Sequence, residues 1–212
     1  MYAMNIVNFE EANILASRKE GSLKRTNFIG ADFIAADLRE SDFERVNLRE
    51  ANFERAELEG ANFKEANLKW TNFRKANLKG ADLRKANLMG VDLREANLTD
   101  TNLEGANLKG ANLHGANLKR ANLKGANLED ADLNWATLRG ANLVGSNLIG
   151  ANFTGSNLEC ADFINANMEL SNLTWANLKG ANLDGANLDG ANLKEAYFVT
   201  NDQLFKVKSY LQ

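Results

Sequence analysis

Apolar side chains recur at every fifth position over residues 21–200 of this chain. Each quintet reads small residue, Asn or Asp, Leu or Phe, and then two variable positions, as in Ala106-Asn107-Leu108-Lys109-Gly110. We number these positions 1 to 5, so that position 1 is the small residue. The stretch holds 36 quintets without an insertion. An uninterrupted repeat of this kind dictates the fold of the whole segment.

A period of five excludes a continuous α-helix or a long β-strand. Each helical residue turns by about 100°, so every fifth Leu would advance by about 140° and circle the helix. In a strand, side chains alternate between faces, and five is odd. The chain must therefore turn once per quintet. Positions 1 and 3 then share an inward face, and the Asn or Asp between them points outward or toward the turn.

Glycine marks the predicted corner at position 5, which holds fifteen of the 16 Gly residues. Such a preference indicates a backbone with positive φ, as in type II turns. Charged residues such as Arg45 and Glu50 also occupy position 5. We therefore expect that positive φ is not obligatory at every corner.

Phe and Leu alternate at position 3 in the first coils, which indicates an even number of sides. Phe occurs every ten residues there, with Leu between, and the Phe residues would lie on two opposed sides. The alternating Phe residues are Phe33, Phe43, Phe53, Phe63 and Phe73.

The tandem Ala-Asn/Asp-Leu/Phe-x-x pattern resembles the pentapeptide-repeat proteins. The resemblance covers about 180 of the 212 residues. It implies an all-β fold, a right-handed four-sided parallel β-helix with 20 residues per coil and about nine coils over 21–200. Coils stacked at ~4.8 Å would form a rod of roughly 43 Å. Some members of the family mimic B-form DNA and engage type II topoisomerases, so the resemblance allows that function too.

The two ends depart from the repeat. Residues 1–20 are predicted to be an irregular N-terminal coil that caps the rod, with Ser17–Glu20 resetting the register. Residues 201–212 are predicted to be a short capping helix, because Leu204, Val207 and Leu211 follow a capping-box pattern at helical spacing. The alternative is that this C-terminal end forms a dimer contact, although we favour a monomer.

Composition indicates the cellular compartment in which the protein is expected. The formal net charge is −3, and the one cysteine, Cys160 at position 5, excludes an internal disulfide framework. No segment is apolar and long enough to span a membrane, and residues 1–20 lack the pattern of a secretory signal. We therefore expect a cytoplasmic protein that does not associate with membranes.

Enzyme signatures are absent from the sequence. His114 is the only histidine, which excludes a multi-histidine metal site, and no phosphate-binding or dinucleotide motif occurs. We expect no catalytic residues, no cofactor and no metal.

The surface charge predicts no contact with nucleic acid. When the repeat is sorted into four sides, acidic and basic residues nearly balance on each, and we expect Lys and Arg to interrupt the acidic charge everywhere. A DNA mimic needs a duplex-like density of negative charge, and a DNA-binding protein needs a basic stripe. DNA mimicry of the topoisomerase-binding kind is therefore the alternative rather than the preferred function.

Two surface features indicate a protein partner instead. Contiguous apolar surface often marks a binding site, and Trp is enriched at interface hot spots. The first feature is a predicted apolar patch of Val144, Ile149, Ile164 and Leu170. The second is the position-5 column of Trp135, Gly155 and Trp175, in which two indoles ~9.6 Å apart at their attachment points would wall a slot over Gly155. The alternative is that each Trp packs flat over a neighbouring turn. The preferred function is a non-enzymatic scaffold or regulator that binds an unidentified protein through the C-terminal half of the rod.

Overall fold

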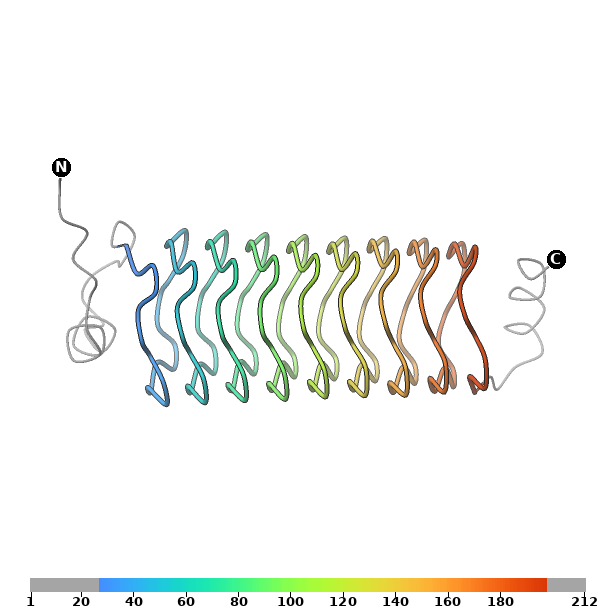
Figure 1. Ribbon diagram of the computed structural model, residues 1–212, viewed down its shortest axis with the longest axis horizontal. Coiled ribbons are helices and arrows are strands. Elements are labelled where there is room, and N and C mark those ends of the chain that lie inside the picture. The colour runs from blue at the N-terminus through green and yellow to red at the C-terminus, as the bar shows by residue number, and fades with distance from the viewer. Residues whose placement is uncertain (1–26, 198–212) are drawn as a thin grey trace.

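The computed structural model describes residues 27–197, which form a straight stack of coils (Figure 1). The chain progresses along the rod from one end to the other, so residues 27 and 197 lie at opposite ends. The predicted cap over 1–20 and the predicted helix over 201–212 lie outside the described residues. The count of nine coils over 21–200 also stays a prediction, because both ends of that range lie outside them.

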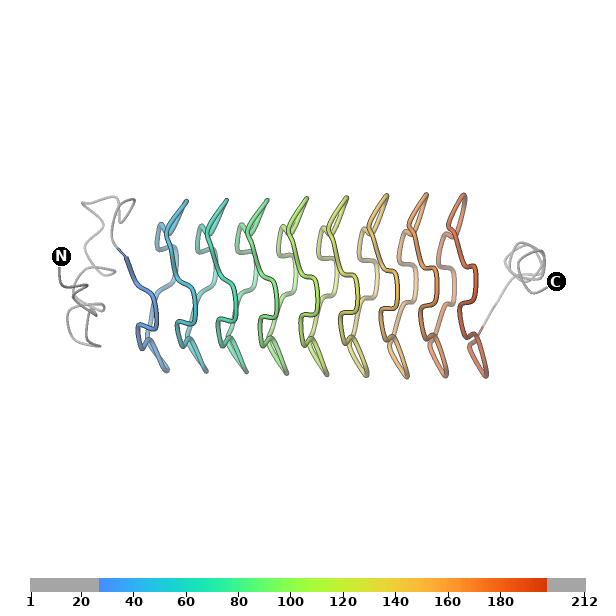
Figure 2. The same ribbon diagram turned by 45° about the horizontal axis from the view of Figure 1, so that its top comes forward.

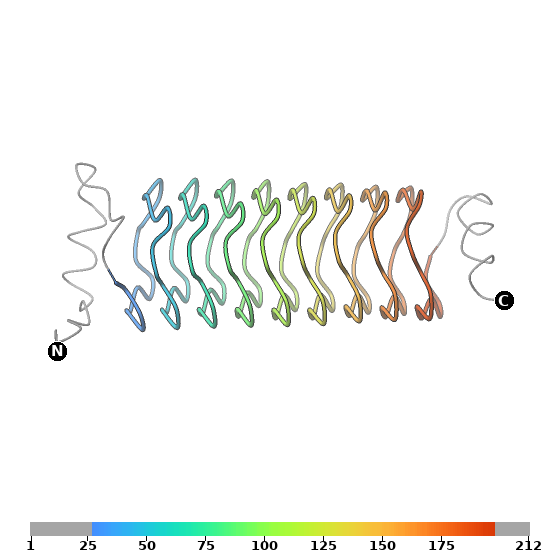
Figure 3. The same cartoon turned by 90° about the horizontal axis from the view of Figure 1, so that it is seen from above.

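Each coil contains twenty residues. Every position-2 residue from Asn27 to Asn177 forms a parallel bridge with the residue twenty positions later, ending at Asn177↔Tyr197. The bridges are single-residue contacts separated by turns, and residues 27–197 contain no longer strand and no helix. It follows that no helix in this range could cross a membrane. The coils stay in register when the rod is viewed from other directions (Figures 2 and 3).

Backbone hydrogen bonds join each coil to both of its neighbours. The position-3 amide donates to a position-2 carbonyl of the next coil, as in Leu108 N–H to Asn127 O at 2.6 Å. The amide of Asn127 donates back to the Ala106 carbonyl at 2.9 Å, and Gly110 N–H donates to the Glu129 carbonyl at 2.9 Å. Three backbone hydrogen bonds per quintet therefore join neighbouring coils and satisfy most of the buried backbone polar groups along the rod.

The core is the column of position-1 and position-3 side chains, as predicted. All position-3 residues from Phe28 to Leu188 are buried, and Leu193 in the last described coil is half-buried. Phe33 and Phe53 stack with ring centroids 4.6 Å apart, and Phe43 and Phe63 stack at 5.0 Å on the opposed side. The prediction of Phe on two opposed sides is confirmed.

Positive φ occurs at every corner of the described rod, which corrects the expectation for charged residues. All position-5 residues from Gly30 to Glu195 have φ between 53° and 69°, including Arg45 and Glu50. The position-1 amide closes each corner by donating to the preceding position-3 carbonyl, as in Ala111 N–H to Leu108 O at 2.9 Å. Stacking each corner on two others holds non-glycine residues in a conformation that costs them roughly 1–2 kcal/mol in isolation.

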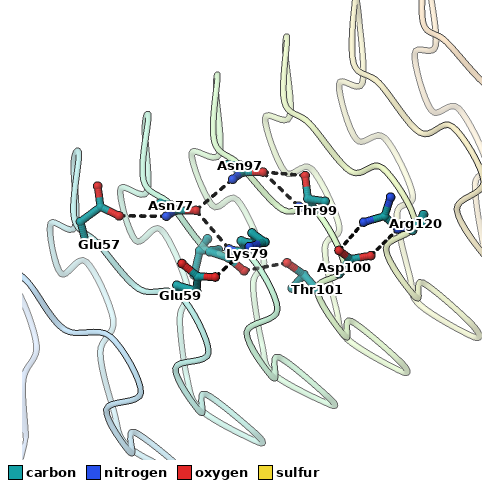
Figure 4. A network of polar contacts seen from close by, with 10 residues as sticks. Glu57, Glu59, Asn77, Lys79, Asn97, Thr99, Asp100, Thr101 and Arg120 are labelled. Carbon is teal, nitrogen blue, oxygen red and sulfur yellow. Dashed lines mark hydrogen bonds and ion pairs between the residues drawn. The ribbon is translucent and has the colours of Figure 1, made fainter.

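The position-2 side chains line the outer walls and tie coils together. Their oxygens accept from the position-4 amide, as in Thr99 N–H to Asn97 Oδ1 at 3.2 Å, which stabilises the turn. Asn97 also donates to Asn77 Oδ1 of the preceding coil at 2.9 Å, and Asn77 donates to Glu57 at 2.9 Å (Figure 4). The same view shows the ion pairs Lys79–Glu59 and Arg120–Asp100, which also join successive coils.

Candidate partner-binding surface

A position-5 side chain leans over the corner of the following coil. A Cβ added to a corner glycine would meet the side chain of the residue twenty positions earlier, for example Lys85 at Gly105 and Asp130 at Gly150. Where that earlier residue is itself glycine, as for Gly125 and Gly145, the added Cβ would meet nothing within 4 Å. A corner glycine therefore acts as the seat for the side chain of the preceding coil.

This rule corrects the predicted slot between the two indoles. The position that a Cβ of Gly155 would take lies 2.7 Å from both Cε3 and Cζ3 of Trp135 and 2.9 Å from its Cη2. Near-equal distances to three adjacent ring atoms mean that one face of the ring lies flat on Gly155. The ring thus fills the gap, as in the alternative of flat packing. Its outer side remains accessible, since Trp135 is 58% exposed.

The other two Trp residues are held differently. Trp175 leans toward Glu195 and donates from Nε1 to Oε2 of that residue at 2.6 Å. Trp70 approaches Gly90 through Cδ1 and Nε1, and the guanidinium carbon of Arg49 lies 4.9 Å from the centroid of its ring. Among the described residues, a cation–π contact forms on Trp70 and not on Trp135 or Trp175.

The predicted site residues gather around two adjacent sides of the C-terminal half. We define wall A by the position-2 residues Asn127, Asn147, Asn167 and Asn187, and wall B by Asp132, Asn152, Asn172 and Asn192. The corner between them, the shared corner, is formed by positions 4 and 5 of the wall A quintets. It carries Ile149 and Leu170, while Val144 and Ile164 border the other edge of wall A.

Wall B is flanked by three exposed large apolar side chains. Leu170 on the shared corner is 62% exposed, and Trp135 and Trp175 lie on the far corner of wall B. Val144, Ile149 and Ile164 are half-buried. The structure therefore places all seven candidate residues on two neighbouring walls, although their role in binding stays a prediction.

The two walls are acidic and contain no base over most of their length. Between residues 126 and 193, walls A and B and their three corners hold no Lys or Arg. Their acidic residues are Glu129, Asp130, Asp132, Glu169, Asp184 and Asp189. Arg139 and Lys179 lie on the fourth corner, away from both walls. The expectation that basic residues interrupt every side throughout is wrong for this stretch.

Acidic residues elsewhere on the rod are commonly neutralised by a base one coil away. Arg45 hydrogen-bonds Glu65 at 2.8 Å and holds the pKa of that carboxyl below its usual range. The Arg120 guanidinium likewise lowers the pKa of Asp100. In the described part of the chain, Asp130, Glu169 and Asp189 form no ion pair. Glu129 on the shared corner is paired with Lys109 of the preceding coil at 2.8 Å. The candidate surface thus combines exposed apolar groups with three carboxylates that form no ion pair.

Comparison with known proteins identifies the repeat. The family model for pentapeptide repeats matches eight copies, over residues 26–64, 61–100, 96–134, 131–169 and 171–199. A solved structure of HetL, a pentapeptide repeat protein involved in heterocyst differentiation regulation from the cyanobacterium Nostoc, is 35% identical. It covers 85% of this chain and 85% of its own, with a TM-score of 0.48.

A second solved structure supports the fold alone. Full-length QnrB1, a plasmid-mediated fluoroquinolone resistance protein, is 24% identical with a TM-score of 0.55, covering 86% of this chain and 85% of its own. This likeness and the family match support a right-handed β-helix. A comparison with curated proteins gives no significant match.

Proposed function

Because the chain belongs to the pentapeptide-repeat family, we propose that it is a non-enzymatic scaffold or regulatory protein. It acts through contacts with a partner protein on the outer surface of its β-helix. The observation that carries this proposal is the arrangement of walls A and B, where the exposed side chains of Trp135, Leu170 and Trp175 share the surface with three carboxylates that form no ion pair. Large exposed apolar side chains that gather on one surface commonly mark an interface.

Three further observations support a role in regulation rather than catalysis. HetL, which is 35% identical over most of both chains, is described as involved in the regulation of differentiation. Residues 27–197 contain no group of three or more side chains suited to holding a metal ion. His114, the single histidine, is exposed on a turn rather than enclosed among other polar groups.

Capture of the native partner with matched Trp variants tests the proposal. The full-length chain and the double variant Trp135→Ala/Trp175→Ala would be used as bait in extracts of the native host, with captured proteins identified by mass spectrometry. Trp70→Ala is the control, because Trp70 lies in the column of the shared corner but nearer the N-terminal end. We expect the double variant to lose the partner and the control to keep it. Equal capture by all three chains would place the interface elsewhere.

The acidic walls also favour testing the second candidate, a DNA mimic that binds a type II topoisomerase. Asp130, Glu169 and Asp189, which form no ion pair, give the shared corner a local approach to the charge of a duplex. A supercoiling assay of DNA gyrase with and without the protein separates the two functions. Inhibition or protection of gyrase would support mimicry, whereas an unchanged supercoiling rate would leave the scaffold function.

A further inference from the structure

We infer that walls A and B accept a basic amphipathic segment of the partner protein, in which Lys or Arg side chains flank apolar ones. This inference rests on the proposed function, because it names the chemistry of the partner at the same surface. It follows from the distribution of charge along the rod and from the order of side chains on the shared corner.

Charge separates along the axis of the rod. Residues 27–125 contain 15 acidic and 16 basic residues, whereas residues 126–197 contain 9 acidic and 3 basic residues. The first part therefore has a net charge of +1 and the second a net charge of −6. The excess of acidic over basic residues in the second part lies mainly on walls A and B. A cationic segment would be attracted to this half and oriented by the contrast between the two halves.

The shared corner alternates carboxylate and apolar groups along the axis. Asp130 leans over Gly150, with its Oδ1 2.6 Å from the position of an added Cβ, so its carboxylate lies beside Ile149. Leu170 leans over Gly190 in the same way, beside Asp189. A segment lying along this corner would meet the Asp130 carboxylate, Ile149, then Leu170 with Glu169 beside it, and finally the Asp189 carboxylate. The segment that matches this order has apolar side chains interspersed with cationic ones.

The far corner of wall B supplies a further site for a cation. The inner face of Trp135 is seated on Gly155, and its outer side is open. A guanidinium or ammonium group on an aromatic face is attracted by the ring quadrupole. Trp70 already illustrates this chemistry within the chain, with Arg49 on its ring. The equivalent contact on Trp135 is left for the partner.

Other occupants fit these groups less well. An acidic segment or a nucleic acid would place like charges next to Asp130, Glu169 and Asp189. A purely apolar segment would remove the same carboxylates from water without giving them a partner, which is costly. A basic amphipathic segment covers Leu170 and neutralises the carboxylates together.

Binding of three synthetic peptides to the full chain tests this chemistry. Each has about 20 residues, enough for several turns of helix, and a fluorescent label. The first carries a Leu/Trp stripe with Lys and Arg, the second the same stripe with Glu, and the third the same bases with Ser in place of the stripe. Fluorescence anisotropy would be measured at about 0.05 M and about 0.5 M salt, to vary screening.

We expect the first peptide to bind at least about tenfold more tightly than either of the others at low salt, because it alone matches both charge and apolar surface. It should also retain part of its affinity at high salt. Equal binding of the first and second peptides would overturn the inference. Equal binding of the first and third would also overturn it, since charge alone would then be responsible.

Charge-reversal variants locate the binding. Glu169→Lys/Asp189→Lys should raise the Kd of the first peptide about tenfold or more. The control Glu40→Lys/Glu104→Lys makes the same change in net charge in the other half and should shift the Kd by less than about twofold. Similar weakening by both variants would overturn the assignment to walls A and B. Circular dichroism would verify that each variant stays folded.

The peptide measurements and the capture of the native partner fail independently. If the partner is lost from the Trp135/Trp175 variant but the peptides show no preference for basic charge, the proposed function stands and this inference fails. If the basic peptide binds walls A and B but these walls capture no protein from the host, the proposed function fails while the chemistry of the surface is established.

Discussion

At the scale of single residues, the corner position explains why glycine is frequent but not required. A corner glycine such as Gly155 receives the side chain of the residue twenty positions earlier. At Gly145 that earlier residue is itself a glycine, so no side chain lies over it. Both have positive φ, at 65° and 63°. Substitution by Ala should therefore impose the same backbone cost, about 1 kcal/mol, at either position.

The pair Gly155→Ala and Gly145→Ala isolates the contact with Trp135. The new methyl group at 155 would displace the indole, whereas the one at 145 would enter open space. We expect Gly155→Ala to shift the NMR signal of the Trp135 indole N–H and to lower the melting temperature more than Gly145→Ala does. Indistinguishable indole signals in the two variants would contradict the flat seating of Trp135.

The small core position is tested by Ala106→Leu. Ala106 is 1% exposed, and three added carbon atoms have no space between stacked coils. Overpacking of this kind typically costs about 1–3 kcal/mol, so thermal unfolding should occur at a clearly lower temperature. Lys124→Leu, at an exposed position-4 site three quintets further along, is the control and should change the melting temperature little.

The sequence predicted the core but not the corners. Burial follows from the period, because only one face of each quintet can point inward, and Phe33 and Leu108 are buried as expected. Backbone conformation at Arg45 could not be deduced from its type, since the neighbouring coils impose a φ that the residue alone disfavours. The seating of Trp135 had a signal in the sequence, because both Trp70 and Trp135 are followed by Gly twenty residues later.

At the scale of one wall, the position-2 amides add bonds between coils that the backbone does not supply. Asn97 donates to Asn77 and accepts from the hydroxyl and amide of Thr99. Asn117, one coil further along, accepts only from the Lys119 amide. The two positions share a wall and differ in the number of their side-chain hydrogen bonds.

Asn97→Ala should therefore destabilise the rod more than Asn117→Ala. Each net hydrogen bond contributes about 0.5–1.5 kcal/mol, so the two extra bonds of Asn97 predict a difference of about 1–3 kcal/mol. Chemical denaturation of the two variants measures this difference. Equal midpoints and slopes would show that the amide ladder contributes nothing beyond the turns.

The ion pair between coils at Asp100 and Arg120 predicts a dependence on pH. Arg120 hydrogen-bonds both carboxylate oxygens of Asp100, at 2.6 and 2.5 Å, and lowers the pKa of Asp100 in the folded state. The resulting stabilisation is present above the pKa of the unfolded chain, about 3.9, and is lost as the pH falls through the lower folded value. It is expected to be small, because both groups are exposed.

Arg120→Gln should accordingly lower the melting temperature slightly at pH 7, and this difference should disappear as the pH falls through the folded pKa of Asp100, because the protonated carboxyl group loses its pairing with Arg120. Lys119→Gln removes an adjacent charge that forms no ion pair and is the control. An NMR titration of Asp100 would show its midpoint moving upward in Arg120→Gln. A midpoint unaffected by Arg120→Gln would contradict the pairing.

At the scale of the whole molecule, the position of the candidate surface depends on the order of charges along the chain. Totals for each side hide this order, because the bases of the first half offset the acids of the second. The order of charges follows from the twenty-residue coil, which places Glu169 and Asp189 in one column of the second half. The glycine twenty residues later indicates a seat for Trp135, but the sequence could not show that the ring lies flat on it or that Asp130 lies beside Ile149, because both depend on the direction in which corner side chains lean.

Deletions of whole repeats test whether binding is local to the C-terminal half or continuous along the rod. Removing residues 86–105 deletes one coil and keeps every remaining wall aligned, since bridged residues are twenty apart. Removing residues 86–90 deletes one quintet and rotates the first part of the rod by one side relative to the second. Walls A and B lie wholly beyond both deletions.

We therefore expect both variants to bind the basic amphipathic peptide with a Kd within about twofold of the parent, because the acidic groups that steer it are unchanged. A duplex-like stripe along the rod would be interrupted by the quintet deletion alone, so loss of binding in that variant and not in the coil deletion would contradict a local surface.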